Sequence, residues 1–171
     1  MARNIEIKAQ VSDVAALEQR VAVVADRGPE QLYQDDTFFA CPAGRLKLRD
    51  FGDGHGELIF YQRADQSGPK TSYYRIAPTT EPEALRQVLL EAYGSPGRVV
   101  KQRTLYLAGR TRIHLDRVEG LGDFMELEVV LGEDEAPEHG LAEAQQLMAR
   151  LGIESDALIE GAYLDLLAAA G

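Results

Sequence analysis

Cysteine is nearly absent from this sequence of 171 residues, and Cys41 is the only one. A single cysteine excludes an intrachain disulfide and a zinc site built from several thiolates, and it is typical of a reducing compartment. Long apolar runs of the kind found in signal peptides or membrane spans are also absent. We therefore expect a cytoplasmic protein with no membrane association. At this length we expect one domain, residues 1–171, with a core that needs no cross-links.

Basic side chains are fewer than acidic ones: the sequence has 18 Lys and Arg and 28 Asp and Glu, which gives a formal net charge of -10. Residues 1–117 carry 17 basic and 15 acidic side chains, net +2, whereas residues 118–171 carry 1 and 13, net -12, which together give -10. An acidic total argues against a surface that neutralises nucleic-acid phosphates. Only four of the basic residues are lysines: Lys8, Lys47, Lys70 and Lys101.

Alternation of apolar and polar residues with period two predicts eight β-strands in the first 130 residues. Glycines in the short links between several of them favour antiparallel hairpins. The predicted strands are 3–10, 33–40, 45–50, 57–63, 71–77, 98–107, 111–118 and 124–131.

Four other segments have helical periodicity, so the predicted fold class is α+β. Capping residues and glycines mark their ends. The expected boundaries are Ser12 for the start of the first helix, Thr80 and Gly94 for the second, Leu141 and Gly152 for the third, and Ser155 for the start of a fourth that runs through Leu166.

The two faces of the predicted strands differ in charge. In the first strand Asn4, Glu6 and Lys8 share one face, whereas Ile5 and Ile7 share the other. A half-buried sheet with a charged solvent face would explain any one strand. Six strands taken together favour a sheet that curls into an eight-stranded antiparallel β-barrel or tunnel, with a charged lumen and with its apolar side facing peripheral helices. The other charged positions are Lys47, Arg49, Glu57, Arg63, Lys101, Arg103, Arg112, His114, Asp116, Glu126 and Glu128.

Lining a lumen with lysine and arginine costs desolvation free energy unless an anion fills the lumen. Arginine forks and lysine charges suit phosphate oxygens, whereas carboxylates at i and i+2 of one strand, about 7 Å apart, suit Mg²⁺ or Mn²⁺. The mixture predicts a metal-bound polyphosphate, and the number of cations favours a triphosphate. A nucleic-acid backbone is not expected to enter an enclosed bore with an acidic exterior.

The order of these motifs resembles the CYTH superfamily, the triphosphate tunnel enzymes that include class IV adenylate cyclases and thiamine or inorganic triphosphatases. The opening residues 4–8, Asn-Ile-Glu-Ile-Lys, are similar to the family's E-x-E-x-K signature. Asn4 stands where that signature has its first glutamate. The other matching segments, in the family's order, are 44–49, 57–63, 101–103, 112–116 and 124–128. The resemblance covers nearly the whole chain and looks closest to the class IV cyclase-like branch.

The resemblance implies a role for each matched residue. Glu6, Glu126 and Glu128 would hold the metal ions and act in catalysis, and Asp116 would lie beside the metal or the sugar. Arg75, on a strand with fewer charges, is a weaker candidate for substrate binding. The other implied substrate-binding residues are Lys8, Lys47, Arg49, Arg63, Lys101, Arg103 and Arg112.

Three activities remain open at this point. A cyclase would convert ATP to cyclic AMP and pyrophosphate, whereas a hydrolase would direct water at inorganic, thiamine or nucleoside triphosphate. A binding protein would hold a triphosphate or polyphosphate without turnover. The expected partner is in each case a small triphosphate-containing molecule, and the resemblance also admits a homodimer. His114 is expected to line the lumen rather than to catalyse, and the aromatic-rich residues 33–39 are expected to pack in the core or at the rim.

Overall fold

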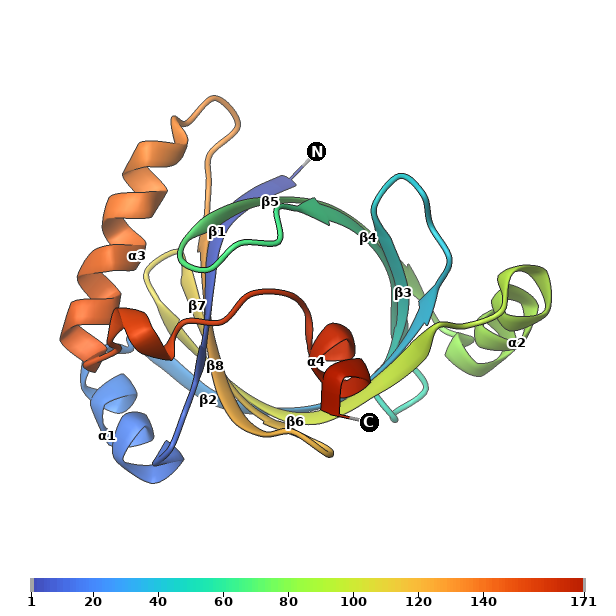
Figure 1. Cartoon of the computed structure of the whole chain (residues 1–171), viewed down its shortest axis with the longest axis horizontal. Coiled ribbons are helices and arrows are strands. Elements are labelled where there is room, and N and C mark those ends of the chain that lie inside the picture. Colours follow the sequence, from blue (N-terminus) through green and yellow to red (C-terminus); the bar gives the residue numbers. More distant parts are fainter. Residues whose placement is uncertain (1, 171) are drawn as a thin grey trace.

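A ring of eight antiparallel strands dominates the structure, a computed structural model that describes residues 2–170 (Figure 1). The ring closes in the order β1-β5-β4-β3-β2-β6-β7-β8. The strands are β1 (Ala2–Gln10), β2 (Arg27–Phe39), β3 (Arg45–Asp50), β4 (Gly56–Arg63), β5 (Lys70–Thr79), β6 (Gly97–Ala108), β7 (Thr111–Val118) and β8 (Gly122–Val130). The α+β fold with a tunnel-like sheet that the sequence predicts is confirmed.

The pairing register places charged positions of neighbouring strands side by side. Glu126 of β8 lies opposite His114 of β7 and opposite Lys8 of β1, and Glu128 lies opposite Arg112 and Glu6 in the same way. Because alternate residues of a strand face the same side, one correct register brings all of these side chains to the same face of the sheet.

Strand β2 is longer than the sequence predicts. It begins at Arg27 rather than Tyr33, and it pairs with β6 from Arg27 to Phe38. The pairing register shifts between Arg27 and Glu30, and Pro29 lies within this irregularity. A shift of this kind breaks the period-two pattern, which explains why the first half of the strand was missed.

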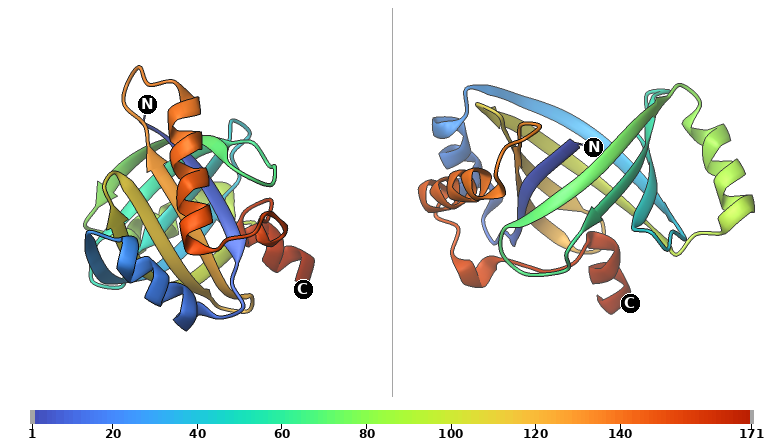
Figure 2. Two further views of the ribbon diagram at one scale, coloured as in Figure 1. Left: turned by 90° about the vertical axis from the view of Figure 1, so that its left-hand side faces the viewer. Right: turned by 90° about the horizontal axis from the view of Figure 1, so that it is seen from above.

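Helices lie outside the ring and cover two parts of it (Figure 2). α1 and α3 contact each other and the β1, β6, β7 and β8 side, whereas α2 lies against β2 and β3. In residues 2–170, none of the helices combines the length and the apolar character needed to cross a membrane. The helices are α1 (Val14–Val24), α2 (Pro82–Tyr93), α3 (Pro137–Leu151) and α4 (Tyr163–Ala170), with a 3₁₀ turn at Ser155–Ala157.

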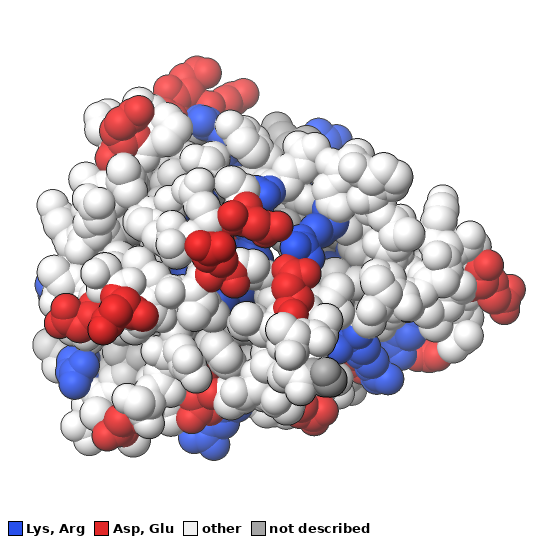
Figure 3. Space-filling view, in the orientation of Figure 1, with Lys and Arg blue, Asp and Glu red and all other residues white. Residues whose placement is uncertain are grey.

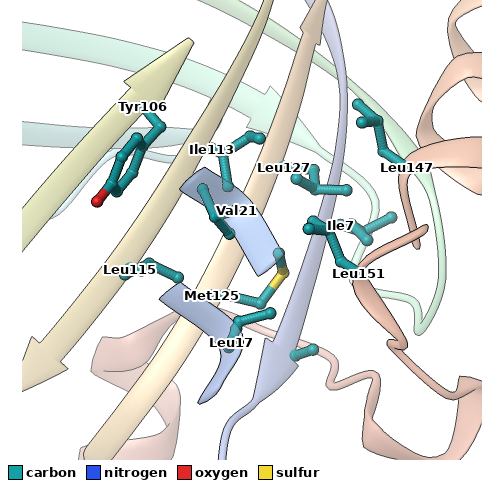
Figure 4. Close-up of a cluster of buried hydrophobic side chains, with 11 residues drawn as sticks. Ile7, Leu17, Val21, Tyr106, Ile113, Leu115, Met125, Leu127, Leu147 and Leu151 are labelled. Carbon is teal, nitrogen blue, oxygen red and sulfur yellow. The ribbon is translucent and has the colours of Figure 1, made fainter. Parts of the chain in front are cut away.

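The largest hydrophobic cluster lies between the outer face of the ring and helices α1 and α3 (Figure 4). Burying each large apolar side chain contributes roughly 1.5–3 kcal/mol, so this layer holds the sheet and helices together. The sheet therefore turns its apolar side outward to the helices, as expected. The strand residues are Ile7, Ala9, Tyr106, Ile113, Leu115, Met125 and Leu127, and the helix residues are Leu17, Val21, Leu147 and Leu151.

Three predicted helix starts need correction, because α3 begins at Pro137 rather than Leu141, and α2 follows Glu81 rather than Thr80. Asp13, not Ser12, caps α1, because its Oδ1 accepts a hydrogen bond of 3.0 Å from the Ala16 backbone N–H. Gly94 and Gly152 follow α2 and α3 as predicted. Gly152 has a left-handed φ of 70°, a conformation that favours glycine at the end of a helix.

The predicted fourth helix is wrong over its first half. After the 3₁₀ turn the chain extends, and the Ile159 backbone N–H donates to the Lys8 carbonyl at 3.0 Å. Gly161 has a positive φ of 77°, and α4 begins only at Tyr163. Pairing with β1 and this glycine turn replace the helical turns that the apolar spacing predicts.

As a result, α4 covers part of one end of the tunnel (Figure 1). Tyr163 packs there against the apolar residues Phe38, Val99, Val118 and Phe124, which continue the inward, charged face of their strands toward this end. The Phe124 and Tyr163 rings meet edge to face with centroids 5.1 Å apart. Apolar packing around Tyr163 thus closes part of this end of the bore.

Leu127→Ala should destabilise the fold by about 2–5 kcal/mol, because Leu127 is fully buried between the ring and the helices. Urea unfolding followed by circular dichroism would measure the loss. Val23→Ala on α1 is the control, since Val23 is 82% exposed and should change stability by less than about 0.5 kcal/mol. Equal effects of the two substitutions would contradict the proposed packing layer.

Candidate functional site

A cavity of about 350 Å³ lies inside the ring, a size within the usual range for small-molecule sites. All eight strands contribute side chains to its wall, and Ala162 and Tyr163 contribute from the C-terminal segment. On the face where α4 lies, basic and acidic side chains surround a hollow near the centre (Figure 3). The cavity is therefore the place where the charged faces of the strands meet.

Ten of the twelve site residues proposed from the sequence line this cavity. The cationic ones are Lys8, Lys47, Arg49, Arg63, Lys101, Arg103 and Arg112, and the acidic ones are Glu6, Glu126 and Glu128. Strand parity therefore places these residues correctly, whereas their chemical roles remain predictions.

Arg75 is a correction, because its side chain is exposed and lies outside the cavity wall. The inward positions of β5 are Ser72, Tyr74 and Ile76. Tyr74 pairs with Tyr61, which also lines the cavity, and this register turns Arg75 to the outside. Arg75 is thus excluded as a residue that contacts a ligand in the cavity.

Asp116 is the second correction, because Arg103 and Tyr163 cover it on the inward face of β7 and it does not line the cavity. The side chain is fully buried and receives hydrogen bonds of 2.7 and 2.6 Å from the Arg103 guanidinium. The Tyr163 hydroxyl donates a third bond of 2.9 Å to the same carboxylate. Asp116 therefore orients Arg103 and Tyr163, and no role beside a metal or sugar follows from its position.

Asp36 is a cavity residue that the sequence analysis missed. Its carboxylate accepts a 2.7 Å bond from Lys47 Nζ and two bonds of 2.8 Å from Arg49. Burial opposes its ionisation, but Arg49 and Lys47 outweigh burial and hold the pKa of Asp36 well below its usual range. The alternation of Gln34, Asp36 and Phe38 was the available signal, although the aromatic residues nearby favoured simple packing.

Two of the cavity lysines have a strongly lowered pKa. Burial, and then the neighbouring Arg49, lower the pKa of Lys47 to about 8 despite the contact with Asp36. Burial, and then Arg103, lower the pKa of Lys101 to about 7. Within residues 2–170, Lys101 has no carboxylate within ion-pair distance. An anion that enters the cavity would therefore meet lysines that are ready to take up protons.

The acidic side of the cavity is formed by Glu126 and Glu128 of β8 together with His114 of β7. One donor atom from each residue lies within 4.8 Å of the others, a separation that a divalent ion can bridge. Burial opposes ionisation of Glu126, yet Lys8 and Arg103 hold its pKa well below its usual range. Burial, and then Arg103, lower the pKa of His114, which favours the neutral form of its imidazole. Ionised carboxylates and a neutral imidazole are suitable ligands for a divalent metal.

Glu6 has a different environment from the other two predicted metal ligands. Its Oε1 pairs with Arg63 Nη1, and Arg63 also donates a 3.0 Å bond to the Gly161 carbonyl. Asn4, next along the same face, is buried, and its Oδ1 has no hydrogen-bond partner. His114 therefore joins Glu126 and Glu128 in the closest donor group, while Glu6 and Asn4 line the cavity beside it.

Tyr163 connects the C-terminal segment to the cations. Lys8 Nζ lies 4.0 Å and Lys101 Nζ 4.9 Å from the centroid of its ring, which is a cation–π arrangement with both lysines. Lys8 also donates a 3.3 Å bond to the Gly161 carbonyl. The sequence carries no signal for this role, because the predicted helix placed Tyr163 on an ordinary apolar stripe.

The far end of the cavity has apolar and aromatic side chains beside the charged residues Glu57, Arg112 and Glu128. Leu32 and Leu105 lie beyond Gln34 and Arg103 on their strands, away from Phe38 and Val99 at the α4 end. Phe51, Tyr74 and Ile76 also line the wall, and Ile76 is 44% exposed. The cavity thus combines a cationic middle with an apolar and aromatic region.

Comparison with known proteins agrees with this geometry. The chain is 26% identical to Adenylate cyclase CyaB of Aeromonas hydrophila over 95% of this chain and 87% of that protein. A protein of Pyrococcus horikoshii OT3 has a similar fold, with a TM-score of 0.85, 22% identity and coverage of 96% of this chain and 99% of the other. A conserved hypothetical protein of Pyrococcus furiosus matches with a TM-score of 0.84 and 20% identity, over 95% and 99% of the two chains.

The family model of the CYTH domain matches residues 2–163, which include every strand of the ring and all ten of the cavity-lining candidates. The match covers nearly the whole chain and agrees with the resemblance seen in the motif order. This chain therefore belongs to the CYTH domain family.

Proposed function

We propose that this chain is a metal-dependent enzyme that acts on a triphosphate bound in the tunnel. The observation that carries the proposal is that seven lysine and arginine side chains line the same cavity as a group of two carboxylates and an imidazole. Cations in this number suit a chain of phosphates, and the opposite group suits a divalent ion that accompanies them. Membership of the CYTH family supports the same conclusion.

Within this class, the proposed reaction is that of a class IV-like adenylate cyclase, which converts ATP to cyclic AMP and pyrophosphate. The relative from Aeromonas hydrophila carries an adenylate cyclase name. In this reaction the ribose 3′-oxygen attacks the α-phosphorus, loses its proton, and pyrophosphate leaves. A bound divalent ion would supply Lewis-acid stabilisation of the phosphoryl oxygens.

The residues of the chain would neutralise charge on the leaving pyrophosphate. Arg49 and Arg103 are held in place by Asp36 and Asp116, so their guanidinium groups are oriented before the substrate binds. Preorganised donors of this kind stabilise developing charge without having to rearrange during the reaction. Lys101, which lacks an ion-pair partner among the described residues, would gain one from the phosphate chain.

The apolar and aromatic side chains at the end of the cavity away from α4 favour a substrate with an organic group. Leu32, Leu105 and Tyr74 offer surfaces against which a planar base or a sugar could pack, whereas inorganic triphosphate would leave them without a partner. This observation supports a nucleoside triphosphate. A hydrolase acting on thiamine or inorganic triphosphate, and a binding protein without turnover, are the alternatives that product analysis separates.

Purified protein with Mg²⁺ or Mn²⁺ should convert ATP to cyclic AMP and pyrophosphate. Thiamine triphosphate and inorganic triphosphate, incubated separately, should release little orthophosphate in comparison. Ion-exchange chromatography of the products would distinguish the reactions. Orthophosphate as the main product would indicate a triphosphatase, and binding without any product would indicate a non-catalytic protein.

Glu126→Ala should lower kcat by about 100-fold or more while affecting ATP affinity much less, because the carboxylate acts mainly through the metal. Arg49→Ala should weaken ATP binding by about 10- to 100-fold and also lower turnover, since it removes charge-assisted contacts with phosphate. Isothermal titration calorimetry and a turnover assay would measure the two effects.

Arg75→Ala is the matched control for Arg49→Ala, because Arg75 lies on the outer face of the same sheet. It should leave binding and turnover unchanged. Wild-type activity in Glu126→Ala would refute the metal assignment. A similar loss in both arginine variants would show that overall charge, rather than the cavity, controls binding.

Binding of ATP without divalent metal at pH 8 should take up protons. Lys101, with a pKa of about 7, and Lys47, with a pKa of about 8, are partly neutral in the empty cavity, and a bound polyanion raises both pKa values. Calorimetry in two buffers of different ionisation enthalpy would give the uptake, expected to approach roughly one proton. Lys101→Met should reduce it, and an unchanged uptake in that variant would contradict this account of Lys101.

A further inference from the structure

His114 holds a buried nitrogen that lacks a hydrogen-bond partner. The residue is only 4% exposed, and its Nδ1 makes no hydrogen bond among the described residues. Leaving a buried polar atom unpaired costs roughly 1–3 kcal/mol, so such an atom in a cavity wall requires an explanation. A ligand bound in the cavity would provide one.

The unpaired nitrogen faces the two carboxylates of β8. His114 Nδ1 lies 3.9 Å from Glu126 Oε2 and 3.8 Å from Glu128 Oε1. These distances are too long for hydrogen bonds, and one donor atom from each of the three residues lies within 4.8 Å of the others, a separation that a divalent ion can bridge. The antiparallel register, which pairs His114 directly with Glu126, fixes this spacing.

The remaining oxygen donors near this group are weaker than in an all-carboxylate site. Asn4 offers an amide oxygen, which is unpartnered and 3% exposed, and the Glu6 carboxylate is engaged by Arg63. Mg²⁺ strongly prefers oxygen ligands, whereas imidazole is a favourable ligand for transition-metal ions. A site that contains one imidazole and loses one carboxylate shifts its preference toward the transition metals.

We propose that His114 Nδ1 is a direct ligand of the divalent ion and that this nitrogen makes the site prefer Mn²⁺ to Mg²⁺. The inference rests on the metal-dependent part of the proposed function, and it names the ion and the ligand that the function leaves open. In the competing arrangement, Nδ1 carries a proton, His114 only orients the two carboxylates, and the ion binds oxygen alone.

Electron spin-echo envelope modulation of Mn²⁺ bound to the protein, without nucleotide, distinguishes the two arrangements. A directly coordinated imidazole should give ¹⁴N modulation in the wild-type protein, and His114→Gln should abolish it. His139→Gln is the control, because the His139 side chain is 73% exposed on α3 and should leave the modulation intact. Bound Mn²⁺ without ¹⁴N modulation, or modulation that survives in His114→Gln, would overturn the proposal.

Metal competition gives a second measurement, which does not depend on the ¹⁴N modulation. The electron paramagnetic resonance signal of free Mn²⁺ reports its affinity, and titration with Mg²⁺ reports the selectivity. His114→Gln should weaken Mn²⁺ binding by about 10- to 100-fold, a loss typical of a perturbed metal site, and Mg²⁺ binding by less than about threefold. An unchanged Mn²⁺ to Mg²⁺ preference would refute the role of the nitrogen.

Separate control measurements test whether the variants fold and whether the proposed function holds. Thermal melting would show whether His114→Gln is folded, and Glu126→Gln should weaken both metals because it replaces a shared carboxylate. If wild-type protein shows ¹⁴N modulation but no turnover of any triphosphate, the proposed function fails and the metal site stands. If it turns over ATP without ¹⁴N modulation, the function stands and the inference about His114 fails.

Discussion

Burial of charge inside a closed sheet is the constraint on which the rest of the structure depends. Seven cationic side chains line the cavity, and removing each ion from water costs several kcal/mol unless a partner compensates. Acidic residues placed on neighbouring strands supply that compensation. Asp36 binds Lys47 and Arg49, Asp116 binds Arg103, and the register that pairs the strands also pairs these charges.

The acids divide into two groups with different consequences. Asp36 and Asp116, with exposures of 1% and 0%, are each tied up by a bidentate arginine and hold the cations in position. Glu126 and Glu128 lie beside His114 instead, where a divalent ion would bind them. Such an ion would also take over the role of partner from Lys8 and Arg112, whose charges would then be available to phosphate. A divalent cation and a polyanion are therefore each expected to increase the affinity of this cavity for the other.

The outer layer follows from the same division of faces. Since the inner face carries the charges, the apolar residues of β1, β7 and β8 must be covered from outside, and α1 and α3 cover them. Among the helices described, α4 departs from this pattern, because it lies across one end of the ring and brings the Tyr163 ring within cation–π distance of Lys8 and Lys101. The C-terminal segment thereby completes the wall of the cavity as well as covering it.

The sequence by itself determined which residues share a face, because the period of a strand is local and Glu6 and Lys8, or Glu126 and Glu128, remain on one side in any strand that contains them. It also determined the family, through the order of six short motifs. It could not determine which face of β5 turns inward, so Arg75 was misplaced. It also could not determine that His114 lies beside two carboxylates. Both depend on strand register, which is set by pairing between segments distant in the sequence. The position of Tyr163 was likewise decided only by the tertiary structure, since the contacts of Ile159 and Gly161 with β1 and β4 override the helical spacing of the apolar residues.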